Sequence, residues 1–337
     1  MSDRPNVLVT RPIMDAPLAR LGERCDVEIH RNEFGIPREE LLEVVEGRDA
    51  IVTMLTEKVD AELLAAAGPR LKVVANHAVG FDNIDVAACT AAGVLATNTP
   101  DVLTETTADT AFALLMTAAR RVGEGERFLR AKTPWIWGPL MMLGQDVHHK
   151  TIGVVGFGRI GQAVARRAKG FGMRVIYADA VQLPPEVEAE TGAERRTFPE
   201  LLAESDFISI HTNLTPETRH LFGAEAFRTM KPTAVLVNTA RGAVVQERAL
   251  VDAVRDGEIA GAALDVVTEE PLPADDPLRG VDGIVVYSHM AGQTAQARAA
   301  AGLEGAAELV AALAGRPRYA VNAHLFAVPA TTPEETA

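Results

Sequence analysis

A glycine-rich turn between two short apolar runs constrains the fold of this chain more than any other feature. Residues 150–161 read Lys-Thr-Ile-Gly-Val-Val-Gly-Phe-Gly-Arg-Ile-Gly, a strand-like run that leads directly into a Gly-x-Gly-x-x-Gly turn. A helix-like segment and a second apolar run follow, and Asp179 stands about eighteen residues after the last glycine. Gly156 permits the tight turn, Gly158 admits a pyrophosphate and Gly161 lets the helix pack closely, while the acid binds a ribose. The segment predicts a βαβ unit that binds a dinucleotide.

Length, charge and cysteine content narrow the class of protein. A chain of 337 residues is long for one core and predicts two domains. A net charge of -13 argues against a nucleic acid or an anionic membrane as partner. Cys25 and Cys89 form neither a disulfide framework nor a metal-binding spacing. The first residues lack an apolar signal core, and no apolar run is long enough to span a membrane. We therefore expect a cytoplasmic protein with no bound metal.

Strand-like and helix-like segments alternate along the chain. Apolar runs typical of buried strands cover residues 6–10, 26–29, 50–53, 72–75 and 94–97, then 151–155, 175–178, 207–210, 234–237, 261–264 and 284–287. Helical spacing appears between them, for example at 37–45, 60–67 and 247–255. This alternation predicts an α/β protein with two doubly wound parallel sheets. We expect the alanine-rich helix at 294–313 to return to the first domain, and residues 329–337 to be disordered.

Three side chains at the ends of later strands suggest a reaction centre. Arg241 follows one strand, Glu270 comes soon after the next and His289 ends another. Each alone reads equally well as a surface ion-pair residue, a cap or a satisfied histidine. Together, in a chain that also carries a dinucleotide-binding unit, they supply the groups that hydride transfer to a keto carbon requires. An arginine binds and polarises the substrate, a histidine donates the proton and a carboxylate keeps that histidine charged.

Over nearly its full length the chain resembles the D-isomer-specific 2-hydroxyacid dehydrogenases. The motifs that carry the resemblance are Gly80–Asp85, the glycine-rich turn, Asn238–Gly242, Leu264–Val267, Glu270–Pro271 and Ser288–His289. Within the family it is most similar to the glyoxylate/hydroxypyruvate reductases, through residues 100–109, the Trp135-x-Trp137-x-Pro139 segment and residues 158–172. The resemblance implies a Rossmann NAD-binding domain at 102–289 and a flavodoxin-like substrate domain made of 1–101 and 290–337.

The resemblance also implies a role for individual residues. Arg241, Glu270 and His289 match the catalytic residues of the family. The substrate-binding positions are Leu55, Ala78, Val79, Gly80, Trp135, Arg241 and His289. The cofactor-binding positions are Thr107, Gly156, Gly158, Arg159, Ile160, Gly161, Asp179, His211, Thr212, Asn213, Thr239, Ala240, Arg241, Asp265, His289 and Gly292. Such enzymes are usually homodimers, with the tryptophan-bearing segment reaching towards the partner. For His77 two interpretations are open, a packed loop histidine or a contact with substrate.

Together these features predict NADH-dependent reduction of glyoxylate or hydroxypyruvate to the D-2-hydroxy acid, in a cleft between the domains, with the proton supplied by His289. Asp179 favours NADH over NADPH because its charge repels a 2′-phosphate, and the next residues, Ala-Val-Gln, supply no arginine. Two enzymatic alternatives are open, a phosphoglycerate dehydrogenase and a phosphite dehydrogenase. The chain shows no regulatory domain or basic cluster for the first, and it carries Val79 where the second would have lysine. A dinucleotide-sensing corepressor on the same scaffold is the non-enzymatic alternative.

Overall fold

The computed structural model describes residues 4–323, which form two compact units. Unit 1 runs to Leu103 and resumes at Thr294, and unit 2 comprises Thr104–Gln293. From the sequence we expected the boundaries after residues 101 and 289. The tail at 329–337, for which disorder was expected, lies outside the described residues.

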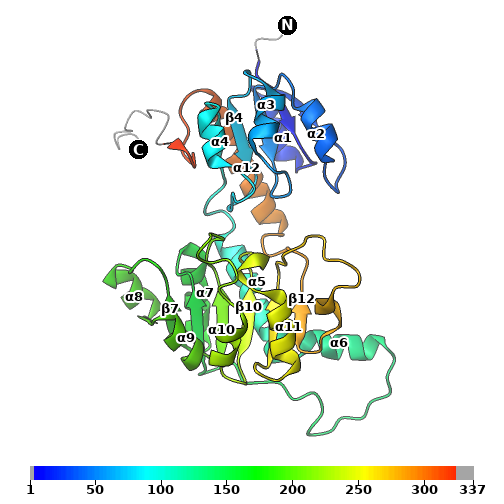
Figure 1. Cartoon of the computed structure of the whole chain (residues 1–337), viewed down its shortest axis with the longest axis vertical. Coiled ribbons are helices and arrows are strands. Elements are labelled where there is room, and N and C mark those ends of the chain that lie inside the picture. Colours follow the sequence, from blue (N-terminus) through cyan, green and yellow to red (C-terminus); the bar gives the residue numbers. More distant parts are fainter. Residues whose placement is uncertain (1–3, 324–337) are drawn as a thin grey trace. The chain divides into compact units, whose positions relative to one another are not determined.

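Unit 1 is a five-stranded parallel sheet with helices on both faces (Figure 1). Its strands are β1 (Asn6–Val9), β2 (Asp26–Ile29), β3 (Ala50–Thr53), β4 (Val73–Asn76) and β5 (Leu95–Thr97), in the order β2-β1-β3-β4-β5. Its helices are α1 (Asp15–Gly22), α2 (Arg38–Val44), α3 (Ala61–Ala67), α4 (Val86–Ala91) and α12 (Ala295–Leu313). Helices α2, α3 and α4 bury their apolar sides on one face of the sheet, and α1 and α12 on the other. This is the flavodoxin-like strand order.

Unit 2 is a seven-stranded parallel sheet in the order β12-β11-β10-β9-β6-β7-β8. The strands are β6 (Thr151–Val155), β7 (Arg174–Ala178), β8 (Ala193–Arg195), β9 (Phe207–Ile210), β10 (Val235–Asn238), β11 (Gly261–Leu264) and β12 (Ile284–Val286). The helices are α5 (Thr104–Ala119), α6 (Val122–Arg130), α7 (Arg159–Gly170), α8 (Pro185–Thr191), α9 (Phe198–Glu204), α10 (Ala224–Thr229) and α11 (Glu247–Arg255), with short 3₁₀ turns η1 (Gly242–Val244) and η2 (Pro277–Gly280). The order of β8 to β11 is that of a Rossmann sheet, with β12 as a further strand.

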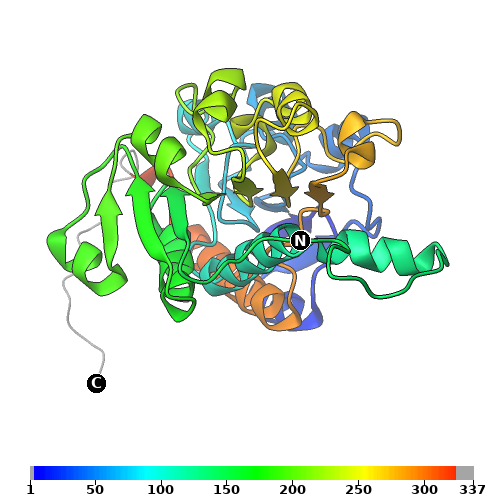
Figure 2. The same ribbon diagram turned by 90° about the horizontal axis from the view of Figure 1, so that it is seen from below.

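Helices cover both faces of the unit 2 sheet (Figure 2). Helices α5 and α7 pack on one face, and α9, α10 and α11 pack on the other. Because both faces are covered, the central strands are continuous apolar runs, every residue of β9, β10 and β11 being buried. The predicted fold class, two doubly wound parallel sheets, is confirmed.

Local signals in the sequence explain where several helices begin. Asp60 accepts a hydrogen bond from the Leu63 N–H at the start of α3, and Thr294 does the same for Ala297 at the start of α12. Thr197 and Glu200 form a reciprocal capping box at the start of α9. Helix α12 packs against α1 and β4, as expected for a helix that returns to the first sheet. No helix between residues 4 and 323 has both the length and the apolar character needed to cross a membrane.

Candidate active site

The glycine-rich turn lies between β6 and α7, at the point where the strand order of unit 2 reverses. Gly156 has φ +86°, and a Cβ there would lie 2.6 Å from the Thr212 nitrogen. A Cβ on Gly161 would collide with the carbonyl oxygen of Gly156, whereas the space beside Gly158 is open. No side chain caps α7, whose N-cap is Gly158, and the positive end of the helix dipole at such an N-terminus attracts an anion. Arg159 and Ile160 open this helix. The turn therefore fits a dinucleotide pyrophosphate.

Asp179 follows β7 directly, and its carboxylate faces the glycine-rich turn. One oxygen accepts a hydrogen bond from the Phe157 N–H at 2.7 Å, and the other accepts one from the Val181 N–H at 2.9 Å. Arg195, at the end of β8, donates to the Asp179 carbonyl oxygen at 3.1 Å. A cation thus lies near the acid, although no arginine follows Asp179 in the sequence. Sequence reasoning missed Arg195 because β8 is a three-residue edge strand with no apolar run.

The segment 211–213 follows β9, on the other side of the sheet's reversal point. The His211 N–H donates to the Val155 carbonyl at 2.7 Å, and its Nε2 lies 2.7 Å from Ser209 Oγ. Burial lowers the pKa of His211 to about 3, so the ring is neutral. Thr212 places its backbone nitrogen against Gly156, and the Asn213 carbonyl accepts a hydrogen bond from Thr218. The segment therefore borders the glycine-rich turn through its backbone.

The loop after β10 carries Arg241 and is folded by Asn238. The Asn238 side chain accepts a hydrogen bond from the Ala240 N–H at 3.0 Å and donates one to the Arg241 carbonyl at 2.9 Å. Arg241 Nη1 donates to the Ala240 carbonyl at 2.7 Å. Thr239 Oγ1 is buried and has no hydrogen-bond partner among the described residues. An orphaned hydroxyl at a strand end fits a polar ligand group, and a contact of Thr239 with a nicotinamide stays a prediction.

Glu270 and His289 form a hydrogen-bonded pair. His289 Nδ1 lies 2.7 Å from Glu270 Oε2, and the Val267 N–H donates to the other carboxylate oxygen at 3.1 Å. Burial would raise the pKa of Glu270, but the bond and charge of His289, the Val267 N–H and the charge of Arg241 together hold it below its usual value. The side chains of His289 and Glu270 are 35% and 37% exposed, so a small molecule can reach them. Because Nδ1 faces the carboxylate, Nε2 is the ring nitrogen left for proton transfer.

Asp265 holds the turn in which His289 sits. His289 has φ +54°, a left-handed conformation, and its N–H donates to the Asp265 carbonyl at 2.7 Å. The Asp265 carboxylate accepts hydrogen bonds from the N–H groups of Met290 at 2.8 Å and Ala291 at 3.0 Å. Burial raises the pKa of Asp265, and these two donors oppose that effect. Gly292 follows the turn, and Thr110 on α5, one helical turn after the buried Thr107, donates to the Ala291 carbonyl.

A pocket of about 580 Å³ in unit 2 opens beside the pair. Asp265, Glu270 and His289 line it, together with Arg127 from α6 and Arg279 from η2. The Arg279 guanidinium donates to the carbonyl groups of Leu272 and Pro273, which shapes this wall. Sequence reasoning missed both arginines, because neither follows an apolar strand.

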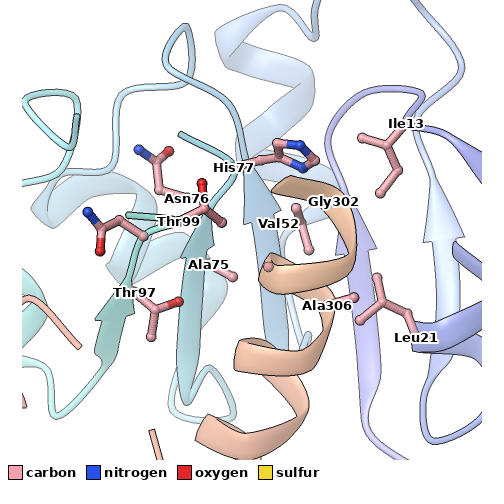
Figure 3. A pocket seen from close by; sticks show the side chains of 12 residues that line it. Ile13, Leu21, Val52, Ala75, Asn76, His77, Thr97, Thr99, Gly302 and Ala306 are labelled. Carbon is pink, nitrogen blue, oxygen red and sulfur yellow. The ribbon is translucent and has the colours of Figure 1, made fainter. Parts of the chain in front are cut away.

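The expected substrate loop Ala78–Gly80 belongs to unit 1 and follows β4. His77, just before it, is 6% exposed, and Figure 3 shows its ring beside Gly302 of α12. Its Nε2 has no hydrogen-bond partner among the described residues, and it borders a cavity of about 10 Å³, room for a single water molecule. Burial and the nearby Arg298 lower the pKa of His77 to about 4. The geometry is that of a packed histidine.

The structure thus pairs Glu270 with His289 in unit 2, and the charge of Arg241 acts on Glu270. The glycine-rich turn and Asp179 lie on the same sheet. Leu55 and the loop Ala78–Gly80 lie in unit 1, so the expected site residues are divided between the two units. Trp135 lies in unit 2 after α6 and is 54% exposed.

The comparisons with known proteins agree with this arrangement. Residues 112–291 match the model of the D-isomer specific 2-hydroxyacid dehydrogenase, NAD binding domain. A glyoxylate reductase of Thermococcus onnurineus is 52% identical over 312 residues, 91% of each chain. A solved glyoxylate reductase from Paecilomyes thermophila is 32% identical with a TM-score of 0.85, covering 96% of this chain and 100% of that one. An NADPH-dependent glyoxylate/hydroxypyruvate reductase from Sinorhizobium meliloti, solved with NADP and malonate, is 30% identical with a TM-score of 0.81, covering 97% and 100%.

Proposed function

The chain belongs to the D-isomer specific 2-hydroxyacid dehydrogenases, and we propose that it reduces glyoxylate, and the related hydroxypyruvate, to the D-2-hydroxy acid with NADH. The observation that carries the proposal is the Glu270–His289 pair at 2.7 Å, with the charge of Arg241 acting on it, in a unit whose glycine-rich turn fits a dinucleotide. The names of the relatives support the choice of substrate.

Each residue has a defined part in the proposed reaction. Bound NADH supplies the hydride for the carbonyl carbon. Arg241 binds the carboxylate and polarises the carbonyl with its guanidinium. His289 delivers a proton from Nε2 to the carbonyl oxygen while Glu270 stabilises the charged ring through Nδ1. Asp265 keeps His289 in place by holding the turn after it. The loop Ala78–Gly80 binds the substrate carboxylate through backbone N–H groups.

NADH is the proposed cofactor because Asp179 offers hydroxyl-binding carboxylate oxygens and a negative charge. The pyrophosphate would meet the N-terminus of α7, including Arg159 and Ile160, and the nicotinamide end would meet Thr239 and the turn around Gly292. The Sinorhizobium meliloti relative is NADPH-dependent, and comparison of kcat/KM for the two cofactors tests the preference of this chain.

We also propose a homodimer that buries the segment after α6. Large apolar side chains there are exposed, including Ile136 at 92%, Trp137 at 76% and Leu140 at 81%. Helix α6 and this segment extend away from the unit 2 sheet (Figures 1 and 2). Contiguous exposed apolar groups mark interaction surfaces. Light scattering should give twice the 35.9 kDa chain mass, and the mass of a single chain would overturn the dimer.

A substrate panel tests the proposed activity. Glyoxylate, hydroxypyruvate, pyruvate and phosphonooxypyruvate are each added to the protein with NADH, and loss of NADH absorbance is followed. We expect turnover with glyoxylate and hydroxypyruvate, and loss of most of kcat in His289→Ala. Preference for phosphonooxypyruvate would instead indicate a phosphoglycerate dehydrogenase. Absence of NADH oxidation with all four acids would refute the proposed function and favour a dinucleotide sensor.

A further inference from the structure

Three hydrogen bonds, each accepted by a backbone carbonyl, hold the loop Ala78–Gly80 of unit 1. The Ala78 carbonyl accepts a bond from the Thr99 N–H at 2.9 Å, and the Val79 carbonyl accepts one from Asn98 Nδ2 at 2.7 Å. The Gly80 carbonyl accepts one from Asn76 Nδ2 at 2.8 Å. Every carbonyl group of the loop is therefore bonded to a donor on β4 or on the segment after β5.

This pattern determines where the N–H groups of the loop point. In a trans peptide the carbonyl and the following N–H lie on opposite sides. Because the carbonyls of residues 78–80 face their donors, the N–H groups of Val79, Gly80 and Phe81 face away from them. None of these three N–H groups donates to a protein acceptor within residues 4–323. Successive unpaired N–H groups of this kind bind anions.

Asn76 does more than bond the Gly80 carbonyl, because it is paired with Asn83. The two carboxamides contact each other at 3.2 Å and 3.3 Å, and Thr53 Oγ1 donates to the Asn76 oxygen at 3.2 Å. Asn76 is 1% exposed, and Figure 3 shows its side chain at the end of β4, pointing to the other side from His77. A buried amide with its donors and acceptors satisfied is held in one orientation.

Asn83 extends the network to the loop that carries Leu55. Its Nδ2 donates to the carbonyls of Met54 at 3.0 Å and Glu57 at 2.9 Å. The same loop is tied from the other side by the Glu57 carboxylate, which is 4% exposed and accepts a bond from the Met54 N–H at 2.6 Å. The paired amides thus connect the two loops of unit 1 that we assign to substrate.

We propose that the Asn76–Asn83 pair is a positioning device for substrate. It holds the Gly80 carbonyl against Asn76, so that the loop presents its N–H groups to a carboxylate. It also fixes the position of the loop that carries Leu55 relative to these N–H groups. The inference rests on the proposed function, because it assigns the anion at these N–H groups as the carboxylate of a 2-oxo acid. Neither asparagine touches substrate, and both act through backbone groups.

The test compares three variants within unit 1. Asn76→Asp replaces the amide donor by an oxygen that repels the Gly80 carbonyl, and Asn83→Ala removes the connection between the loops. Asn322→Ala is the matched control, because Asn322 is a fully buried amide that bonds the backbone of Val94 and Ala96 but not the substrate loops. The readouts are KM and kcat for glyoxylate, Kd for NADH by fluorescence, and the affinity of oxalate, a dicarboxylate, by calorimetry with NADH present.

We expect KM for glyoxylate to rise about 10-fold to 100-fold in Asn76→Asp and about 5-fold to 20-fold in Asn83→Ala, because charge-assisted hydrogen bonds to the carboxylate are weakened. Oxalate affinity should fall by the same factors. Changes in kcat at saturating glyoxylate and in Kd for NADH should stay within threefold, since unit 2 holds the cofactor and the proton donor. Asn322→Ala should lower stability and leave KM unchanged.

Two results would overturn the inference. One is an unchanged KM for glyoxylate and an unchanged affinity for oxalate in folded Asn83→Ala. This result would overturn the inference even if Asn76→Asp does not fold. The other is an equal rise of KM in Asn322→Ala, which would indicate a general loosening of unit 1. Failure of the proposed function looks different, because wild-type protein would then not oxidise NADH with glyoxylate. Oxalate calorimetry would in that case still report whether the pair controls anion binding.

Discussion

The charge of Asp179 should control the choice between NADH and NADPH, and Asp179→Asn removes that charge together with one hydrogen bond, from the Val181 N–H. The amide oxygen can still accept the Phe157 N–H, which the carboxylate binds at 2.7 Å, so the glycine-rich turn keeps its support. A 2′-phosphate carries a charge of about -1.5 to -2. At about 6 Å and an effective dielectric constant of about 40, each unit of charge costs about 1.4 kcal/mol. The repulsion removed is therefore about 2–3 kcal/mol, or about 30-fold to 100-fold in relative affinity.

The assay is kcat/KM for each cofactor at saturating glyoxylate. In Asp179→Asn the NADH/NADPH ratio should fall about 30-fold or more, mostly through better use of NADPH. The effect should shrink as salt is raised from about 0.01 M to about 0.5 M, because Asp179 is only half-buried and salt screens charges that solvent reaches. Arg195→Gln should act in the opposite direction, lowering kcat/KM for NADPH about threefold. Its cation lies beside Asp179 and attracts a phosphate at that end of β7.

Asp252→Asn is the control for net charge, because Asp252 is exposed on α11. A ratio in Asp179→Asn that stays within twofold of the wild-type ratio would refute the electrostatic argument. Discrimination would then come from the shape of the ribose site.

Two further predictions concern the paired carboxylate and the buried histidine. Glu270→Gln should lower kcat about 10-fold to 100-fold with Kd for NADH unchanged, because a neutral amide cannot stabilise the charge of His289; a larger effect on KM than on kcat would contradict this. Burial lowers the pKa of His77 to about 4 in the folded protein, against 6.5 in the unfolded chain. The free energy of unfolding therefore has its full value above pH 6.5 and decreases as the pH falls towards 4, by about 2 kcal/mol at pH 5. The hydrogen-exchange protection of β4 should fall by the same amount between pH 7 and pH 5 in the wild-type protein and in His148→Gln, the exposed control. In His77→Gln the pH dependence of this protection should be weaker. Parallel curves in all three proteins would show that His77 is not responsible.

Much of the fold could be predicted because its signals are local. Buried parallel strands are short apolar runs, and the alternation of such runs with helices defines a doubly wound sheet. The exception is β8, whose sequence Ala-Glu-Arg has no apolar run because it lies at the edge of the sheet. The segment 122–130 was equally hard to recognise, because α6 buries none of its residues and so has no apolar side facing a core.

Part of the candidate site could likewise be predicted from the sequence, and part of it depends on contacts between distant residues. The glycine-rich turn, Asp179, Arg241, Glu270 and His289 stand at or soon after strand ends, where the amino-acid sequence alone indicates ligand binding. Three contacts are seen only in the tertiary structure. Asp265 holds the turn after His289, Arg195 lies beside Asp179, and Asn76 pairs with Asn83. These contacts depend on which strands are neighbours and how each loop folds back. A single polar residue has no periodic pattern that reports its partner, so its role is decided by packing rather than by its place in the chain.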